Sequence, residues 1–116
     1  MSKAENAVTK ACMDYLTLIG AFVWRNNSRT VMMPGKGGKM RPMFFGKVGS
    51  PDIIGILPGG RFIGVECKKP LGPKGGTGGS VQSAEQVEFE KECKARHGLY
   101  VLARSSHDVH EAINRK

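Results

Sequence analysis

The sequence predicts an α/β domain in which a mixed central sheet is flanked by helices. Apolar residues recur at helical spacing near the amino end and in two later segments, and short runs of strand-forming residues lie between these segments. The last of these runs follows a helical segment, so it can join the sheet through a helical crossover. A chain of 116 residues supports one hydrophobic core, and we therefore expect a single domain over residues 1–116.

The segment at the amino end is the first expected helix. Ser2 is a favourable N-cap, and Gly20 is a favourable stop at the carboxyl end. Its apolar stripe consists of residues at helical spacing, namely Val8, Cys12, Tyr15 and Ile19. Residues 21–27 follow as the first expected strand, because they are apolar and bounded by polar residues.

Two glycine-rich segments flank an apolar hairpin in the middle of the chain. Residues 28–49 are basic and contain glycines and prolines, which predicts a flexible basic loop or a loose hairpin with its tip near residues 34–39. Strands are expected over residues 53–57 and 61–68, joined by a Pro-Gly-Gly turn. Residues 69–80 are rich enough in glycine to stay mobile without a ligand.

The remainder of the chain adds a helix, a strand and a last helix. Ser83 and Gln86 form a capping box at the start of the first of these helices, and Gly98 ends it. Its apolar stripe is thin and comprises Val87, Phe89 and Cys93. Residues 99–103 are an expected buried strand, and an amphipathic segment follows. The expected order is therefore αβββαβ with a C-terminal helix.

Three charged residues lie on the apolar hairpin. Strand side chains alternate between faces, so Glu66 and Lys68 share one face while their neighbour Cys67 points into the core. Antiparallel pairing across the turn places Asp52 opposite Glu66. Two carboxylates at such a short distance repel each other. This repulsion is relieved by a raised pKa on one acid, a salt bridge to Lys68, or a divalent metal. A structural cluster of solvated charges at a sheet end is the alternative.

Two further polar residues are site candidates. Glu5 lies two helical turns before Cys12 on the apolar stripe, where an acid is out of place. Its alternative role is a favourable interaction with the positive end of the helix. Gln86 is explained by the capping box alone.

The charge of the chain favours a polyanionic partner. Lys and Arg outnumber Asp and Glu by 18 to 10, which gives a formal net charge of +8 and points to nucleic acid first and to an anionic membrane second. No apolar run approaches the roughly 20 residues of a membrane span, and the amino end lacks the apolar core of a signal peptide. We therefore expect a cytoplasmic protein that is neither secreted nor inserted in a membrane. The candidate phosphate-binding residues are Arg25, Arg29, Lys36, Lys39, Arg41, Lys47, Lys69 and Lys74.

The charged residues of the hairpin and the two further polar candidates lie in short motifs that follow one another along the chain. Pro51–Asp52 lies in "GSPD", Glu66–Cys67–Lys68 ends the hairpin as "ECK", and "SAEQ" opens the next helix. With Glu5 in the first helix, this arrangement resembles the VRR-NUC (virus-type replication-repair nuclease) domain of the PD-(D/E)XK superfamily, in the short stand-alone form found in phages. The resemblance extends over nearly the whole chain and implies the restriction-endonuclease-like PD-(D/E)XK core.

The resemblance implies a metal-dependent active site. Asp52 and Glu66 would bind Mg²⁺ or Mn²⁺ together with the backbone carbonyl of Cys67, and Lys68 would orient or activate the attacking water. Glu5 and Gln86 would be supporting active-site residues, with Glu5 able to reach the metal through a water. Mg²⁺ is usually held by one or two carboxylates and a phosphate, which agrees with this set.

The implied activity is structure-selective hydrolysis of phosphodiester bonds in DNA. The leading hypothesis is a Holliday (four-way) junction resolvase in DNA repair or recombination that acts as a homodimer, since a two-fold junction needs two symmetric cuts and each chain carries one site. The alternatives are a flap or nicking endonuclease and a non-catalytic DNA-binding module.

Overall fold

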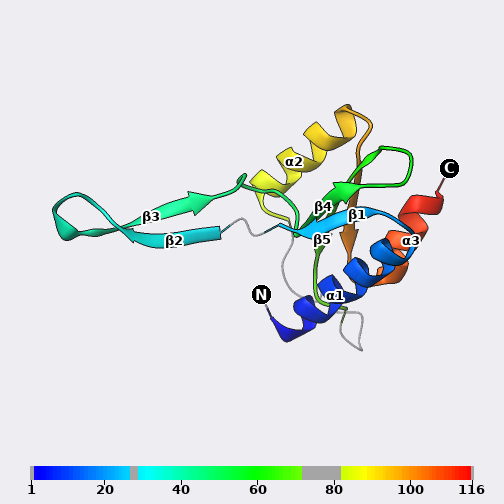
Figure 1. Ribbon diagram of the computed structural model, residues 1–116, viewed down its shortest axis with the longest axis horizontal. Helices are drawn as coiled ribbons and strands as arrows, with labels where there is room; N and C mark the ends of the chain where they lie inside the picture. The colour runs from blue at the N-terminus through cyan, green and yellow to red at the C-terminus, as the bar shows by residue number, and fades with distance from the viewer. Residues whose placement is uncertain (1, 27–28, 72–81, 116) are drawn as a thin grey trace.

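The computed structural model describes residues 2–26, 29–71 and 82–115, and within them the chain forms a mixed α/β domain with a projecting β-hairpin (Figure 1). The helices are α1 (Lys3–Leu18), α2 (Ala84–Ala95) and α3 (Ser106–Asn114). The four-stranded sheet contains β1 (Phe22–Arg25), β4 (Ile53–Ile56), β5 (Phe62–Cys67) and β6 (Leu99–Ala103). A separate two-stranded sheet contains β2 (Arg29–Pro34) and β3 (Met40–Phe45), with the 3₁₀ turn η1 (Lys36–Gly38) between them.

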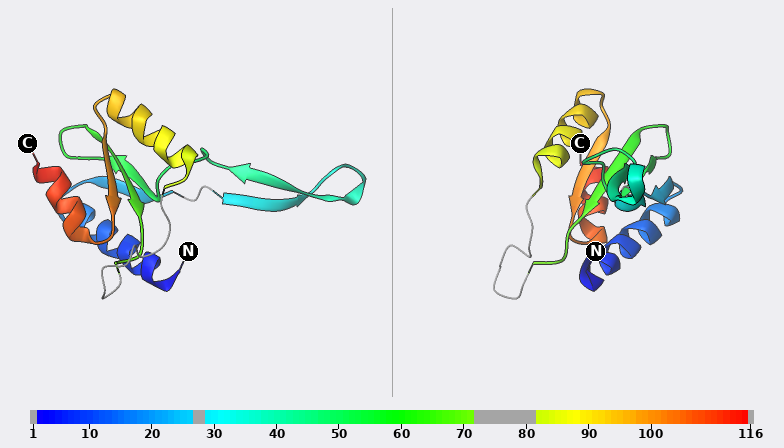
Figure 2. Two further views of the ribbon diagram at one scale, coloured as in Figure 1. Left: turned by 180° about the vertical axis from the view of Figure 1, so that it is seen from behind. Right: turned by 90° about the vertical axis from the view of Figure 1, so that its left-hand side faces the viewer.

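The central sheet is mixed, as the sequence predicts. Its strand order is β1-β4-β5-β6, with antiparallel pairing up to β5 and parallel pairing between β5 and β6. Helices α1 and α3 lie on one face, and α2 lies on the other (Figure 2). Ile53 pairs with Val65, which is the predicted hairpin register and brings Asp52 opposite Glu66. The expected strand over residues 21–27 is shorter than predicted, because β1 contains only the residues that pair with β4.

The core lies between the sheet and helices α1 and α3. One face of β5 supplies Ile63, Val65 and Cys67, all fully buried, as the alternation of side chains predicts. The helices contribute Val8, Cys12, Leu16 and Val109 to the same cluster. Ser2 caps α1 by accepting a hydrogen bond from the backbone N–H of Glu5, so the predicted N-cap is confirmed.

Helix α2 contacts the opposite face of the sheet only through aromatic rings. Its capping box between Ser83 and Gln86 forms as predicted. The expected stripe is wrong at Val87, which is 37% exposed. The ring of Phe89 lies 6.5 Å from that of Phe62 and 6.3 Å from that of Tyr100. None of the residues of α2 is buried.

The hairpin of β2 and β3, residues 29–45, is called the arm below. Its six residue pairs run from Arg29–Phe45 to Pro34–Met40, so the hairpin alternative for this segment is confirmed, with its tip at η1. The arm projects from the domain in both views (Figures 1 and 2). It raises the radius of gyration to 15.8 Å, against about 13 Å for a compact chain of this size.

Part of the second glycine-rich segment lies outside the described residues, and with it Lys74. In the described part of the chain, no helix is both long and apolar enough to cross a membrane.

Candidate active site

Asp52 is held at the end of the sheet by hydrogen bonds from two strands. The backbone N–H of Asn26, just after β1, donates to the carbonyl of Asp52 at 2.7 Å. The Asn26 amide donates to the carbonyl of Pro51 at 3.0 Å. On the other side, the backbone N–H of Cys67 donates to Asp52 Oδ2 at 2.8 Å. The Asp52 carboxylate is therefore tied to the last residue of β5, directly beside Glu66.

Gly64 allows Pro51 to approach the sheet closely. A Cβ atom at Gly64 would lie 2.8 Å from Pro51 Cγ, closer than real Cβ contacts allow. Pro51 is buried in the space that this glycine leaves. Because Asp52 follows Pro51 directly, the glycine helps to place the carboxylate.

Glu66 in β5 and Lys68, the first residue after β5, are two buried charged residues. Their exposed fractions are 5% and 6%. Lys68 Nζ lies 3.9 Å from Glu66 Oε1, which is the outer limit of an ion pair. Glu66 Oε2 is buried and has no hydrogen-bond partner among the described residues. Such an atom is costly unless a proton or a cation compensates it.

The electrostatics of the cluster raise the pKa of Glu66. Burial raises the pKa of its carboxyl from 4.5 to about 8, and the neighbouring Asp52 carboxylate acts in the same direction. Lys68 lowers the pKa but does not offset the other two effects. Glu66 therefore binds a proton at neutral pH when no metal ion is bound beside it.

The backbone carbonyl of Cys67 faces the same side as Asp52. Within a strand, the N–H and C=O of one residue point to the same neighbour, and successive residues alternate. Lys68 N donates to Ala103 of β6, so the polar groups of Cys67 point away from β6, towards Asp52. The thiol of Cys67 faces the core, where its hydrogen bond with Cys12 and its burial raise its pKa. It is therefore a neutral thiol and no metal ligand.

These oxygen atoms fit a hard divalent cation. Two adjacent carboxylates and one backbone carbonyl match the ligands that Mg²⁺ and Mn²⁺ prefer, and Glu66 Oε2 is an acceptor without a donor. Within the described ranges, no group of three or more His, Cys, Asp or Glu side chains could hold a metal. The oxygen atoms that could hold a cation here are those of Asp52, Glu66 and the Cys67 carbonyl.

Glu5 lies at the edge of this site and is engaged in the helix cap. Its carboxylate accepts a hydrogen bond from the Ser2 hydroxyl at 3.2 Å. One turn further on, the buried Thr9 hydroxyl donates to the Glu5 carbonyl at 2.9 Å and interacts with the Cys67 thiol. The amino end of α1 is thus next to the end of β5, but the described contacts of the Glu5 carboxylate are those of a cap.

Gln86 also has a capping role in the structure. Its Oε1 accepts a hydrogen bond from the backbone N–H of Ser83 at 2.9 Å. Sequence reasoning did not single out Tyr100, which is buried opposite Gly64 on the face that carries Glu66. Burial raises the pKa of its hydroxyl, with contributions from Glu66 and Asp52. The Gln82 amide donates to this hydroxyl at 3.2 Å.

The pairing register of β6 with β5 is the signal that could have indicated the position of Tyr100. The residue lies at the second position of an expected strand, and parallel pairing with β5 places it beside Gly64. The sequence alone does not specify that register, because the crossover between the two strands is long.

The candidate basic residues occupy three regions of the described structure. Arg25 ends β1 beside Asn26, and its guanidinium donates to the Asn6 side chain at 3.2 Å. Lys69 is exposed and follows Lys68 directly. The other described candidates belong to the arm or its base, namely Arg29, Lys36, Lys39, Arg41 and Lys47. Lys69 therefore adjoins Lys68 along the chain, and Arg25 is connected to Asp52 through its neighbour Asn26, whose backbone N–H donates to the Asp52 carbonyl.

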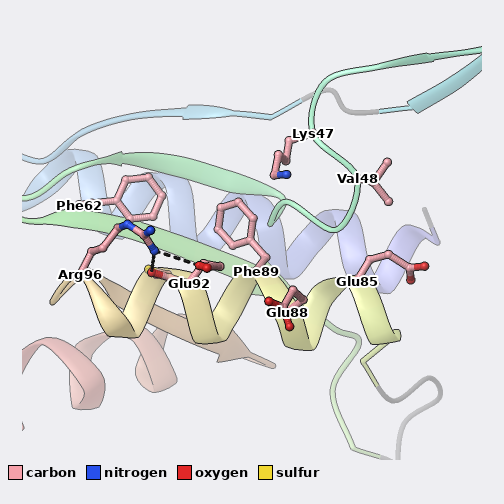
Figure 3. A pocket seen from close by; sticks show the side chains of 10 residues that line it. Lys47, Val48, Phe62, Glu85, Glu88, Phe89, Glu92 and Arg96 are labelled. Atoms are coloured by element: carbon pink, nitrogen blue, oxygen red, sulfur yellow. Dashed lines mark hydrogen bonds and ion pairs between the residues drawn. The ribbon is translucent and has the colours of Figure 1, made fainter.

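A separate groove of about 710 Å³ lies under α2. Phe62 and Phe89 line it between sheet and helix, and Lys47 and Val48 face α2 from the chain that leaves the arm (Figure 3). The residues that line this groove do not include Asp52, Glu66 or Lys68.

No model of a known protein family matches the chain, and no curated protein matches it.

Proposed function

We propose that the protein is a metal-dependent, structure-selective DNA endonuclease of the VRR-NUC type within the PD-(D/E)XK superfamily. The observation that carries the proposal is the cluster of half-buried Asp52 with buried Glu66 and Lys68, in which Glu66 Oε2 has no hydrogen-bond partner among the described residues. A carboxyl with a raised pKa in such a cluster, as for Glu66, is more typical of a reactive site than of a structural ion pair. The mixed sheet, with the cluster at the ends of β4 and β5, supports the PD-(D/E)XK core.

The residues would hold a divalent cation and a DNA phosphate at one place. Asp52, Glu66 and the Cys67 carbonyl would bind Mg²⁺ or Mn²⁺, which supplies positive charge for phosphodiester hydrolysis when bound. Asp52 is already oriented by its hydrogen bond from the Cys67 N–H. Glu66 must lose its proton to act as a ligand, and its raised pKa means that this loss and cation binding are linked.

Lys68 is positioned to act on the phosphate or on the attacking water. Its ammonium group is buried 3.9 Å from Glu66, so it is held close to the carboxylates with little freedom. A preorganised cation at this position stabilises the negative charge that develops on the phosphate oxygens. Lys68 would also orient the attacking water, because its ammonium group can donate a hydrogen bond to the water oxygen.

Arg25 and Lys69 are the basic residues that would bring the DNA backbone to the cluster. Lys69 follows Lys68 directly, and Arg25 precedes Asn26, whose N–H donates to the Asp52 carbonyl. Contacts of such residues with phosphates position a duplex without reading its sequence. A homodimer would present two such sites to the two equivalent strands of a four-way junction. The proposed substrate is therefore a four-way junction.

Cleavage of a panel of labelled substrates tests the proposal. A four-way junction, a flap and a linear duplex are incubated with the protein in Mg²⁺, Mn²⁺ or EDTA. We expect symmetric incisions in the junction that require the metal and leave the duplex intact. Asp52→Asn and Lys68→Ala should each abolish cleavage and retain junction binding, while Lys91→Ala, an exposed lysine on α2, should cleave normally.

Each other outcome has a distinct meaning. Cleavage confined to the flap, or single nicks, would replace the resolvase with a flap or nicking endonuclease. Junction binding without cleavage in either metal would refute the enzyme and favour a DNA-binding module. Loss of circular dichroism in both Asp52→Asn and Lys68→Ala would show that the cluster stabilises the fold instead.

A further inference from the structure

The arm carries apolar side chains on both faces and nothing in the described structure covers them. Paired residues of an antiparallel ladder share a face. One face carries Met32, Phe44 and Met40, which are 53%, 42% and 56% exposed. The other face carries Met33, Met43 and Phe45, also exposed. An isolated two-stranded hairpin is only marginally stable in water, so a partner surface that covers the arm would stabilise it.

The tip of the arm is basic. Lys36, Lys39 and Arg41 are exposed, and they form no ion pair with the described residues. The chain contains no acidic residue between Asp14 and Asp52, so the arm has no negative charge of its own. A surface that covers the arm must therefore be apolar and carry acidic groups near the tip.

The groove under α2 has this composition. Its apolar lining consists of Val48, Phe62, Phe89 and Cys93, and α2 adds three glutamates at its edge, Glu85, Glu88 and Glu92 (Figure 3). Glu92 pairs with Arg96 at 3.0 Å. Glu85 and Glu88 form no ion pair with the described residues and remain to receive the cations of another molecule.

The arm cannot reach the groove of its own chain. The groove lies at the base of the arm, because the chain that leaves β3 packs on the first turn of α2. Gly49 is required at this contact, since a Cβ atom there would lie 2.3 Å from the carbonyl oxygen of Glu85. From this base the arm points away from the domain (Figures 1 and 2). Its six-residue strands extend about 20 Å.

The arm can instead reach the groove of a second copy that is related to the first by a two-fold axis near the middle of the arm. Two arms side by side and antiparallel would place each tip near the base of the other arm, where the groove of that chain lies. The contact would be made twice in one closed dimer, as an isologous interface requires.

We propose that two copies of this chain form a dimer by exchanging arms, with the arm of each copy packed into the groove under α2 of the other. The basic tip lies against Glu85 and Glu88, and the apolar faces of the two arms pack on each other and, near each tip, on Val48, Phe62 and Phe89 of the groove. On each copy, the residues of the arm and the ten groove residues together match in number the roughly 20–30 residues that each partner contributes to a stable interface. The inference rests on the proposed function in one respect, since it gives the proposed two-site nuclease its dimer interface. The contact between arm and groove can form whether or not the protein cleaves DNA.

Charge reversal tests the contact in solution without DNA or metal. The tip variant carries Lys39→Glu and Arg41→Glu, and the groove variant carries Glu85→Lys and Glu88→Lys. Sedimentation should show a dimer for the unmodified chain and at least about tenfold weaker dimerisation for each variant, because like charges then oppose each other. A mixture of the two variants should restore the dimer, since both contacts in the mixed dimer are complementary. Lys3→Glu with Lys10→Glu on α1 is the control with the same change in charge as the tip variant.

Three results would overturn the inference. They are a monomeric unmodified chain, dimers that neither charge reversal weakens, and a mixture of the two variants that stays monomeric although circular dichroism shows both variants to be folded. A tip variant that remains a dimer and loses affinity for a four-way junction would assign the arm to DNA instead. Cleavage is measured separately, so an inactive protein that exchanges arms would refute the nuclease and leave the dimer standing.

Discussion

Replacing Glu66 by glutamine should stabilise the metal-free protein at neutral pH. The buried carboxyl of Glu66 has a pKa raised to about 8, whereas an unfolded chain would have a pKa near the ordinary 4.5. Glutamine resembles the protonated carboxyl in shape and, like it, carries no charge. The substitution therefore removes an ionisation that favours the unfolded state.

The sign and size follow from proton linkage. Below the ordinary pKa of 4.5, Glu66 is protonated in both states and glutamine changes little. Between that value and about 8 the unfolded state ionises while the folded state does not, so the folded protein loses stability as the pH rises. At pH 7 this loss is about 3 kcal/mol. Glutamine should recover most of it, which is a large part of the stability of a small domain.

Chemical denaturation in EDTA at pH 4 and at pH 7 measures the effect. Glu66→Gln should match the unmodified protein at the lower pH and exceed it by about 2–3 kcal/mol at the higher one, with a Tm higher by roughly 10 °C. Glu88→Gln, an exposed glutamate on α2, should change neither value. Adding Mg²⁺ should stabilise the unmodified protein and have little effect on Glu66→Gln. A Glu66→Gln variant that is less stable at neutral pH would refute the reasoning, because the carboxylate would then be well compensated in the fold.

Two further substitutions test the placement of the site. Gly64→Ala should cost about 1–3 kcal/mol in denaturation and lower the rate of cleavage, because its Cβ would displace Pro51 and the adjoining Asp52; a variant of full stability and activity would contradict the role of this contact. Glu5→Gln keeps a side chain that can cap α1, so its Tm should stay unchanged while cleavage falls at least about tenfold if Glu5 supports the reaction. Unchanged turnover would leave Glu5 as a helix-end residue only.

Periodicity and turn chemistry predicted most of the local structure. The caps at Ser2 and Ser83 and the alternation around Cys67 follow from rules that act over a few residues. The register of β4 and β5 was predictable for the same reason, because a short turn joins them and leaves little choice of pairing. The arm was predicted less definitely, since glycine and proline are compatible with a loop or a hairpin.

The sequence by itself determined that Asp52, Glu66 and Lys68 meet at one end of a hairpin, because neighbours in the chain and a tight turn suffice to bring them together. Only the tertiary structure decided how deeply they are buried, that Glu66 Oε2 lacks a partner among the described residues, and that Tyr100 lies on the same face. These properties depend on the packing of β6 and the helices around the hairpin. The same holds for the groove under α2, because its apolar lining brings Val48 and Phe62 together with Phe89 of the helix. Burial and desolvation are set by distant segments, and no local pattern of residues specifies them.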